Sequence, residues 1–209
     1  MNFFITNLWE NPRLFFAWLI IVVFSICCHE FAHAYIAFRE GDPTAVDQGH
    51  LTFNPFKQMG IWSILMFILI GFAWGQVPVN PQNYRRRYSA AVVAASGPLT
   101  NLLLGLLFGA VTFLCIYFEY GDEFAWKMLF YGGVINMVMF ILNMLPVPGF
   151  DGWVILNTFK PDLFRKESEW LRGTFLIVII LVFSFVSYLF KIGEFLIRKE
   201  LYLLALLFE

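Results

Sequence analysis

Charged residues are scarce in this chain of 209 residues, of which only 14% are Asp, Glu, Lys or Arg. Hydrophobic residues make up 60% of the chain and aromatic residues 20%. Soluble proteins carry about 25% charged and about 45–50% apolar residues. So few charges cannot cover a water-facing surface, which excludes an ordinary soluble domain. Most of the chain must lie in lipid, and the composition predicts an all-α polytopic membrane protein.

Cysteine and net charge are low as well, and each excludes a class of protein. The chain has three cysteines and a formal net charge of −1. All three cysteines lie in apolar runs and two are neighbours, which does not suit a disulfide framework. A nearly neutral chain lacks the basic surface that attracts nucleic acid, so we expect no nucleic-acid partner. Internal repeats and long polar linkers are also lacking, and we expect one transmembrane domain over residues 1–209.

Long apolar stretches predict the membrane-spanning helices. A helix that crosses a bilayer needs about 20 apolar residues. Stretches of sufficient length are Leu14–Phe38, Ser89–Phe118, Phe124–Leu145 and Thr174–Phe190, the last of which can continue to residue 197. A fifth stretch, Ile61–Trp74, has only about 14 residues, a length more typical of a buried or re-entrant segment.

Basic residues flank the short stretch on both sides and decide its topology. Arg39 and Lys57 precede it, and arginines 85–87 follow it. Basic residues favour the cytoplasmic side of a membrane, and a single crossing cannot place both flanks there. The sequence therefore predicts about four transmembrane helices plus a re-entrant segment around residues 61–74.

Small residues recur in the second predicted span and indicate close helix packing. They stand at every fourth position and are Gly97, Asn101, Gly105 and Gly109. Small residues let two helix backbones approach in a membrane, and an asparagine among them can donate a hydrogen bond across the interface. We expect this stripe to have a structural role.

Two of the three histidines form the pattern His29-Glu30-Phe31-Ala32-His33. Residues four apart lie one turn apart on the same face of a helix, so the two imidazoles can bind one Zn²⁺. Glu30 projects about 100° away and can reach a water bound to the metal, from which it would take a proton as general base. Because ionisable groups inside a span are costly, metal binding is favoured over an incidental buried pair.

A catalytic zinc ion needs a third protein ligand and one open position. His50 is one candidate, although a loop histidine after a glycine is more simply an interfacial polar residue. Asp151 is favoured over a solvated turn aspartate, because it lies between two apolar runs where an idle carboxylate would be costly. The re-entrant topology also brings Asp151 to the histidines' side of the membrane, whereas a fifth crossing would not. The residues predict one Zn²⁺ per chain, bound by His29, His33 and Asp151.

Several motifs of this chain are similar to those of one family. They are HEFAH (29–33), FREGDPTA followed by GHLTFNP (38–55), VPVNPQNYR (77–85), SGPLTN (96–101) and NMLPVPGFDG (143–152). The chain resembles the site-2 protease family of intramembrane zinc metalloproteases, in its small bacterial form without a PDZ domain. The resemblance implies hydrolysis of a peptide bond within or near a substrate's transmembrane helix, with the same three ligands and with Glu30 as the base.

The resemblance also implies a role for Asn143 and a cellular setting. The matching asparagine would stabilise the oxyanion, a role that suits an amide donor. An interhelical hydrogen bond explains Asn143 equally well. The implied partners are membrane lipid and a transmembrane protein or peptide substrate, and the implied location is the bacterial cytoplasmic membrane with the active site towards the cytoplasm. A catalytic core over about residues 14–158 would be followed by an additional helix at about residues 174–197, and the oligomeric state stays open.

Two other functions are compatible with ionisable residues inside a membrane. A metal or proton transporter also places His, Asp and Glu along its ion pathway. Transporters usually show internal repeats and paired broken helices, which this sequence lacks. A non-catalytic scaffold derived from a protease would normally have lost Glu30 or a ligand, and here all are present.

Overall fold

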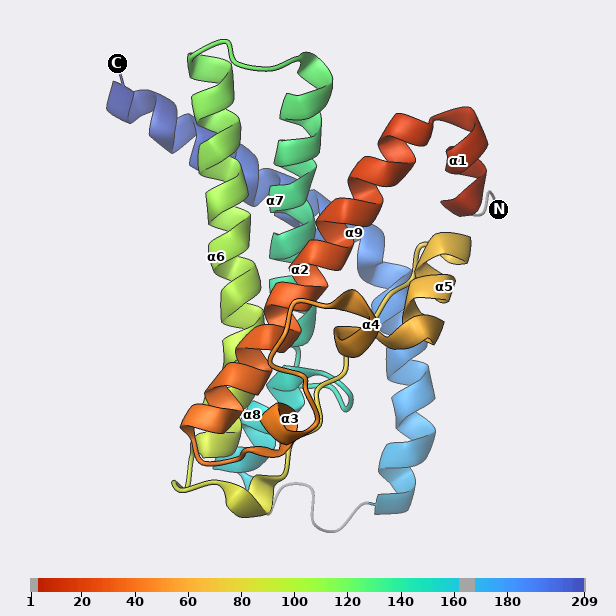
Figure 1. The fold of residues 1–209 in the computed structure, drawn as a ribbon, viewed down its shortest axis with the longest axis vertical. Coiled ribbons are helices and arrows are strands. Elements are labelled where there is room, and N and C mark those ends of the chain that lie inside the picture. The colour runs from red at the N-terminus through yellow and green to blue at the C-terminus, as the bar shows by residue number, and fades with distance from the viewer. Residues whose placement is uncertain (1–3, 162–167, 209) are drawn as a thin grey trace. The chain divides into compact units, whose positions relative to one another are not determined.

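The computed structural model describes residues 4–161 and 168–208, and for residues 168–183 it describes the backbone alone. Within these ranges every regular element is a helix (Figure 1), as the composition predicts. The elements are η1 (Phe4–Thr6), α1 (Asn7–Glu10), α2 (Pro12–Arg39), α3 (Thr44–Asp47), α4 (Pro55–Gln58), α5 (Gly60–Ile70), η2 (Pro81–Asn83), α6 (Ser89–Tyr117), α7 (Glu123–Asn143), α8 (Asp151–Phe159) and α9 (Ser168–Phe208).

The chain folds as two compact units, Met1–Arg86 and Arg87–Glu209. The prediction of one domain over residues 1–209 stays a prediction, because two compact units can belong to one domain. Among the described residues, α2, α6 and α7 are long and apolar enough to cross a membrane. They correspond to the first three predicted spans. The fourth predicted span, Thr174–Phe190, lies within α9, and most of its side chains fall outside the described part of the chain.

Helix α2 dominates the first unit, and its sequence explains where it begins. The side chain of Asn11 accepts a hydrogen bond from the backbone N–H of Leu14 at 3.1 Å, and Pro12 occupies the first helical position. Both features are favourable at a helix N-terminus. Phe4 packs on this region, with its ring centroid 5.0 Å from that of Phe15 and 5.2 Å from that of Phe67 in α5.

The chain between α2 and residue 86 leaves and rejoins the same end of α2. Helix α5 has 11 residues, so it is only about 16 Å long and cannot cross about 30 Å of hydrocarbon. The chain turns at Gly71, whose φ is 82°, and returns without regular secondary structure. Beyond this return limb (residues 72–80) and η2, the backbone N–H of Arg85 donates to the carbonyl of Glu40 at 2.9 Å. This path agrees with the re-entrant segment predicted around residues 61–74.

Asp42, close after the end of α2, accepts hydrogen bonds from the end of the return limb and from the residues that follow it. Its carboxylate is fully buried and accepts from the backbone N–H of Asn80 at 2.6 Å and from Asn83 Nδ2 at 2.8 Å. It also accepts from the backbone N–H and the hydroxyl of Thr44. Burial by itself would raise the pKa of Asp42, but the four hydrogen bonds outweigh it and lower the pKa below its usual range.

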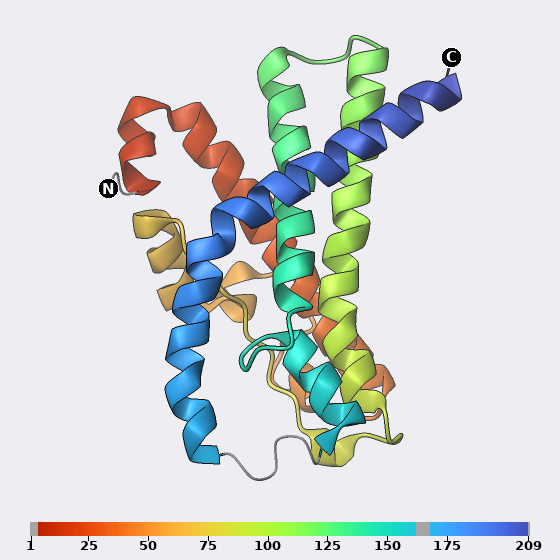
Figure 2. The same ribbon diagram turned by 180° about the vertical axis from the view of Figure 1, so that it is seen from behind.

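Helices α6 and α7 of the second unit run side by side (Figures 1 and 2) and pack closely at the predicted small residues. Asn101 Nδ2 of α6 donates to Asn136 Oδ1 of α7 at 3.0 Å, and both side chains are fully buried. Asn136 Nδ2 donates in turn to the carbonyl of Gly132 at 2.9 Å. A Cβ atom added at Gly105 would lie 3.0 Å from the methyl carbon of Met137. The predicted structural role of the stripe is confirmed.

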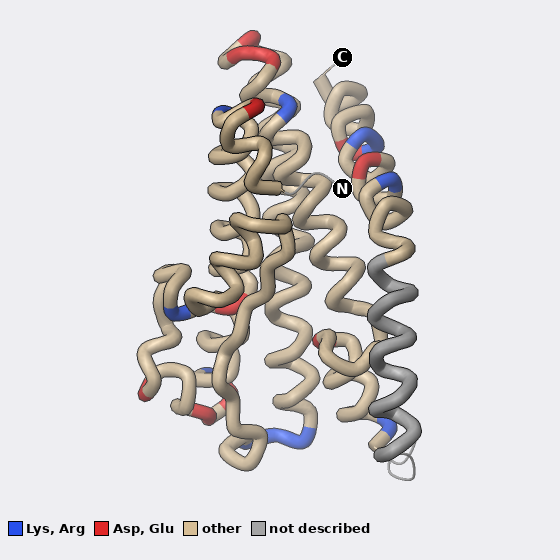
Figure 3. Tube along the Cα trace, turned by 90° about the vertical axis from the view of Figure 1, so that its right-hand side faces the viewer, with Lys and Arg blue, Asp and Glu red and all other residues tan. Residues whose placement is uncertain are grey.

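Charged residues are almost absent from these two helices (Figure 3). Helix α6 carries none between Ser89 and Tyr117, and α7 carries only Glu123 and Lys127. Those two residues form an ion pair at 2.6 Å in the first turns of α7. Large apolar side chains stay exposed along α6, for example Leu103 at 67%. Such a surface is suited to lipid rather than to water.

Helix α9 continues beyond the predicted C-terminal helix of residues 174–197 and ends at Phe208. Figure 2 shows its C-terminal half crossing α7 and then α6. Ile197 is fully buried in an apolar cluster with Val134, Met137 and Val138 of α7. The ring of Phe208 lies 5.2 Å from that of Phe113 in α6. The helix is longer than predicted because apolar residues resume at Leu201, after three charged residues, and the C-terminal part of α9 packs on α6.

We expect Asn101→Ala to destabilise the second unit by about 0.6–2 kcal/mol, because the substitution removes the amide that donates to Asn136 across the helix interface. The free energy of unfolding in detergent micelles, titrated with a denaturing surfactant, measures this loss. Leu103→Ala, at an exposed position of the same helix, is the matched control. An equal loss in both variants would contradict a specific role for the hydrogen bond.

Candidate metal centre

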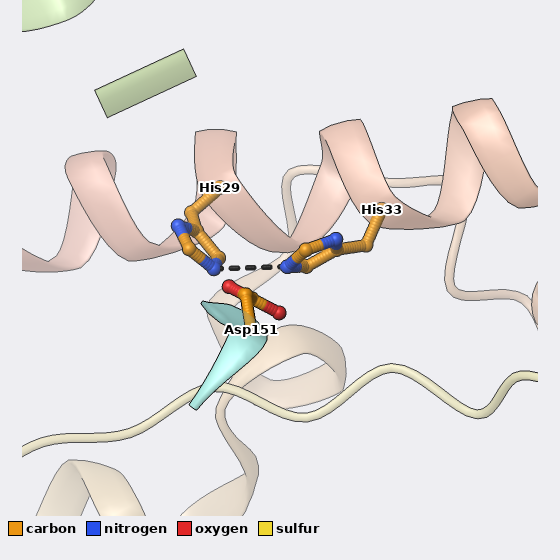
Figure 4. Close-up of side chains that lie close together, drawn as sticks. All are labelled: His29, His33 and Asp151. Carbon is orange, nitrogen blue, oxygen red and sulfur yellow. Dashed lines mark hydrogen bonds between the residues drawn. The ribbon is translucent and has the colours of Figure 1, made fainter. Parts of the chain in front are cut away.

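His29 and His33 lie on one face of α2 and point towards a common position (Figure 4). Their Nε2 atoms are 2.9 Å apart. The ring centroids are 4.6 Å apart, and the ring planes are inclined by 80°. The histidines are 5% and 9% exposed, and Glu30 between them is 8% exposed. The predicted sharing of a face by the two imidazoles is therefore confirmed.

The geometry of the two nitrogens fits a shared zinc ion. Zinc binds imidazole nitrogen at about 2.0–2.1 Å in tetrahedral sites, so two nitrogens on one ion lie about 3.3 Å apart. The observed separation of 2.9 Å is within a few tenths of an ångström of that value. A small movement of either ring brings both nitrogens to ligand distance from one point. The pair can therefore provide two of the ligands that a zinc ion needs.

Glu30 extends from α2 towards the return limb of the first unit. Its carboxyl group lies directly against the backbone of Gly75, because a Cβ atom added at Gly75 would overlap Glu30 Cγ, Cδ and Oε1. The sequence alone does not point to Gly75. Only the path of the return limb brings it beside a residue 45 positions earlier in the chain, and a lone glycine in an apolar segment gives no signal of such a contact.

His50, the alternative third ligand, lies in the loop between α3 and α4. The side chain of Gln58 donates to its backbone carbonyl at 2.9 Å. Burial lowers the pKa of His50, and the positive charge of Lys57 lowers it further. Among the described residues, His50 belongs to no group of three or more potential metal ligands. These observations favour a structural role for His50.

Asp151 is the first residue of α8 in the second unit, where a carboxylate is favourable because of the helix dipole. The loop that precedes it folds tightly against the start of the helix. A Cβ atom added at Gly152 would run into the carbonyl oxygens of Met144 and Leu145. Glycine is therefore required directly after Asp151. Asp151 is half-buried at the end of this closely packed turn.

Asn143 is the last residue of α7 in the same unit. Its Nδ2 donates to the carbonyl of Met139 in its own helix at 3.0 Å. The amide carries two N–H groups, so one donor is left for another acceptor. The alternative expectation for Asn143 is an interhelical hydrogen bond, and the bond that the structure shows lies within α7 instead. The role as an oxyanion stabiliser stays a prediction.

Each residue drawn in Figure 4 offers one ligand atom to a metal ion, an imidazole nitrogen from His29 and from His33 and a carboxylate oxygen from Asp151. Two imidazoles and a carboxylate are a donor set typical of catalytic zinc, which keeps its fourth position for water or substrate. The chemistry of the donor set therefore fits zinc.

Known proteins are similar to this chain over most of its length. Residues 17–124, just over half of the chain, match the model of peptidase family M50. YwhC of Bacillus subtilis, named as a candidate zinc metalloprotease, is 31% identical over 176 residues, which cover 79% of this chain and 78% of YwhC. Rip2 of Mycolicibacterium smegmatis, named likewise, is 31% identical over 169 residues, which cover 77% of this chain and 64% of Rip2.

A third relative comes from an archaeon. MJ0611 of Methanocaldococcus jannaschii, also named as a candidate zinc metalloprotease, is 29% identical over 145 residues, which cover 66% of this chain and 68% of MJ0611. No solved structure matches. The matched segment includes the histidine pair and Glu30, and the extent of the YwhC match exceeds three quarters of both chains. The chain therefore belongs to peptidase family M50, the site-2 protease family of zinc metalloproteases.

Proposed function

We propose that this protein hydrolyses a peptide bond within or near the transmembrane helix of a substrate protein, using a zinc ion bound by His29, His33 and Asp151. Family membership makes the protein a membrane zinc metalloprotease, and it favours this function over a transporter or a scaffold. The position of the cut, the ligand set and the mechanism are the proposed parts. The observation that carries the proposal is the convergent histidine pair inside the apolar helix α2.

The depth of the histidines along α2 supports cleavage inside the membrane. His33 and His29 precede Arg39, at the end of the helix, by six and ten residues. At about 1.5 Å per residue, they lie about 9–15 Å from that end. If Arg39 marks the membrane surface, the metal lies within the hydrocarbon layer. A substrate bond that reaches this depth belongs to a transmembrane segment.

In the proposed mechanism, Glu30 is the acid–base residue. His29, His33 and Asp151 would hold the zinc ion, which would supply a Lewis acid that acidifies the attacking water. Glu30 takes a proton from the attacking water and later delivers it to the leaving amine. The free N–H of the Asn143 amide would donate to the oxygen on which negative charge develops. A helical substrate must unwind locally first, because its own turns shield the scissile bond.

The proposed partners are membrane lipid and a transmembrane protein or peptide. Exposed apolar side chains along α2 and α6, such as Ile20 and Leu103, both 67% exposed, are suited to contact with lipid or with a substrate helix. We place the protein in the bacterial cytoplasmic membrane with its active site towards the cytoplasm. Arg39 and arginines 85–87, clustered after α2 and after the return limb, support this orientation.

Metal analysis tests the proposed ligand set. Detergent-purified wild-type protein should contain about one zinc per chain, and His33→Ala and Asp151→Ala should both lose most of it, because each removes one of three ligands. His50→Ala is the matched control and should keep its zinc. Zinc retained in Asp151→Ala would exclude Asp151 as a ligand, and zinc lost in His50→Ala would make His50 the third ligand.

Glu30→Gln tests the assignment of the base. We expect this variant to keep its zinc and to lose about 10²–10⁴-fold in the rate of peptide cleavage, because glutamine cannot accept the proton. Cleavage of a model transmembrane substrate, reconstituted with the enzyme in liposomes, measures the rate, and metal analysis measures the zinc. A zinc-loaded variant that cleaves at the wild-type rate would show that another group is the base.

A further inference from the structure

The Glu30 carboxyl group and Gly75 are in direct contact, and a side chain at residue 75 would have to displace the Glu30 side chain. A Cβ atom built there would overlap three atoms of the Glu30 side chain, among them the carboxyl carbon. Gly75 is not among the glycines with positive φ. Backbone strain therefore gives no reason for glycine here, and what a larger residue would disturb is the position of the Glu30 side chain.

Hydrogen bonds to their backbone groups fix both chain neighbours of Gly75, Trp74 and Gln76. On one side, the hydroxyl of Ser63 in α5 accepts from the N–H of Trp74 at 2.9 Å and donates to its carbonyl at 2.6 Å. On the other side, the N–H of Gln76 donates to the carbonyl of Gln58 at 2.9 Å. The position of Gly75 is thus fixed from two directions.

The residues that provide these bonds are themselves firmly held. Ser63 and Gln58 are fully buried. The side chain of Gln58 donates to the carbonyls of His50 at 2.9 Å and of Thr52 at 2.6 Å, which ties the loop before α4 to the same structure. A buried serine that binds both backbone groups of one residue satisfies a donor and an acceptor that would otherwise be costly in a low-dielectric environment.

We propose that the backbone of Gly75 positions the side chain of the general base Glu30. Hydrogen bonds with Ser63 and Gln58 fix this stretch of backbone in place. The inference rests on the proposed function, because it assigns Glu30 as the base. A glutamate side chain has three rotatable bonds, and contact with a fixed backbone limits the positions of its carboxyl group. Proton transfer depends on such positioning, and an error of about 1 Å can cost about 100-fold in rate.

A double-mutant cycle tests the contact without any measurement of activity. In metal-free protein, Gly75→Ala should lower the Tm by several degrees, because the new methyl group displaces the Glu30 carboxyl group. In the Glu30→Ala background the same substitution should leave the Tm almost unchanged, because the overlapping atoms are gone. Val79→Ala, at an exposed position of the same limb, is the control and should behave alike in both backgrounds. An equal loss of Tm from Gly75→Ala in both backgrounds would overturn the contact.

Kinetics then test the positioning role. With zinc content equal to that of the wild type, Gly75→Ala should lower kcat by about 100-fold and change KM by less than about twofold, since the base is displaced while substrate binding is kept. Ser63→Ala should lower kcat in the same direction by a smaller factor. Val79→Ala should leave kcat unchanged. A wild-type kcat in Gly75→Ala would overturn the proposal. So would a variant in which only KM rises and kcat stays at the wild-type value.

Failure of this inference is distinguishable from failure of the proposed function. If Glu30→Gln is inactive and Gly75→Ala is fully active, Glu30 is the base and Gly75 does not position it. If Glu30→Gln is active with zinc bound, the proposed mechanism fails first, and the Tm cycle still reports whether the two residues touch.

Discussion

Everything in the first unit depends on a buried carboxylate and two imidazoles that lie inside an apolar helix. Ionisable groups at membrane depth are costly, and they persist where protein groups surround them. Glu30, His29 and His33 are each less than 10% exposed. The return limb supplies part of this surrounding, because its backbone lies against Glu30 at Gly75. The re-entrant path is thus the means by which the chain covers its own ionisable residues.

An irregular limb in an apolar chain creates a second requirement, because its backbone has no helical hydrogen bonds of its own. Irregular backbone is tolerated in a membrane protein only where other groups satisfy it. Ser63, Gln58 and Asp42 meet this need at three successive points of the limb, and all three are fully buried. Ser63 and Asp42 bind the limb through polar side chains that would be costly to bury without these partners, and Gln58 binds it through its backbone carbonyl. The limb and its buried polar contacts therefore stabilise each other.

The sequence predicts those features that depend on local composition. The bounds of α2, α6 and α7 agree with the predicted spans within about two residues, because charges and turn residues flank apolar runs of sufficient length. The bond between Asn101 and Asn136 follows from small residues at helical spacing. The contact of Gly75 with Glu30 could not be predicted, since it depends on the three-dimensional path of the limb. The hydrogen bond of Asn143 within its own helix could not be predicted either, because an amide at a helix end has several alternatives of similar free energy.

A glycine in a crowded position lies beside each carboxylate of the proposed chemistry. Gly75 leaves space for the Glu30 side chain. Gly152, directly after Asp151, lets the carbonyls of Met144 and Leu145 pack against the start of α8. At Gly75 a fixed backbone, rather than a long polar side chain, limits where the Glu30 carboxylate can lie. A backbone contact has few rotatable bonds, so it limits position at a smaller cost in conformational entropy than a second flexible side chain would. It also adds no further ionisable group to a low-dielectric site, which would perturb the protonation of the base. The pattern explains why the residues that shape such a site are difficult to recognise, since the residue that does the positioning has no side chain.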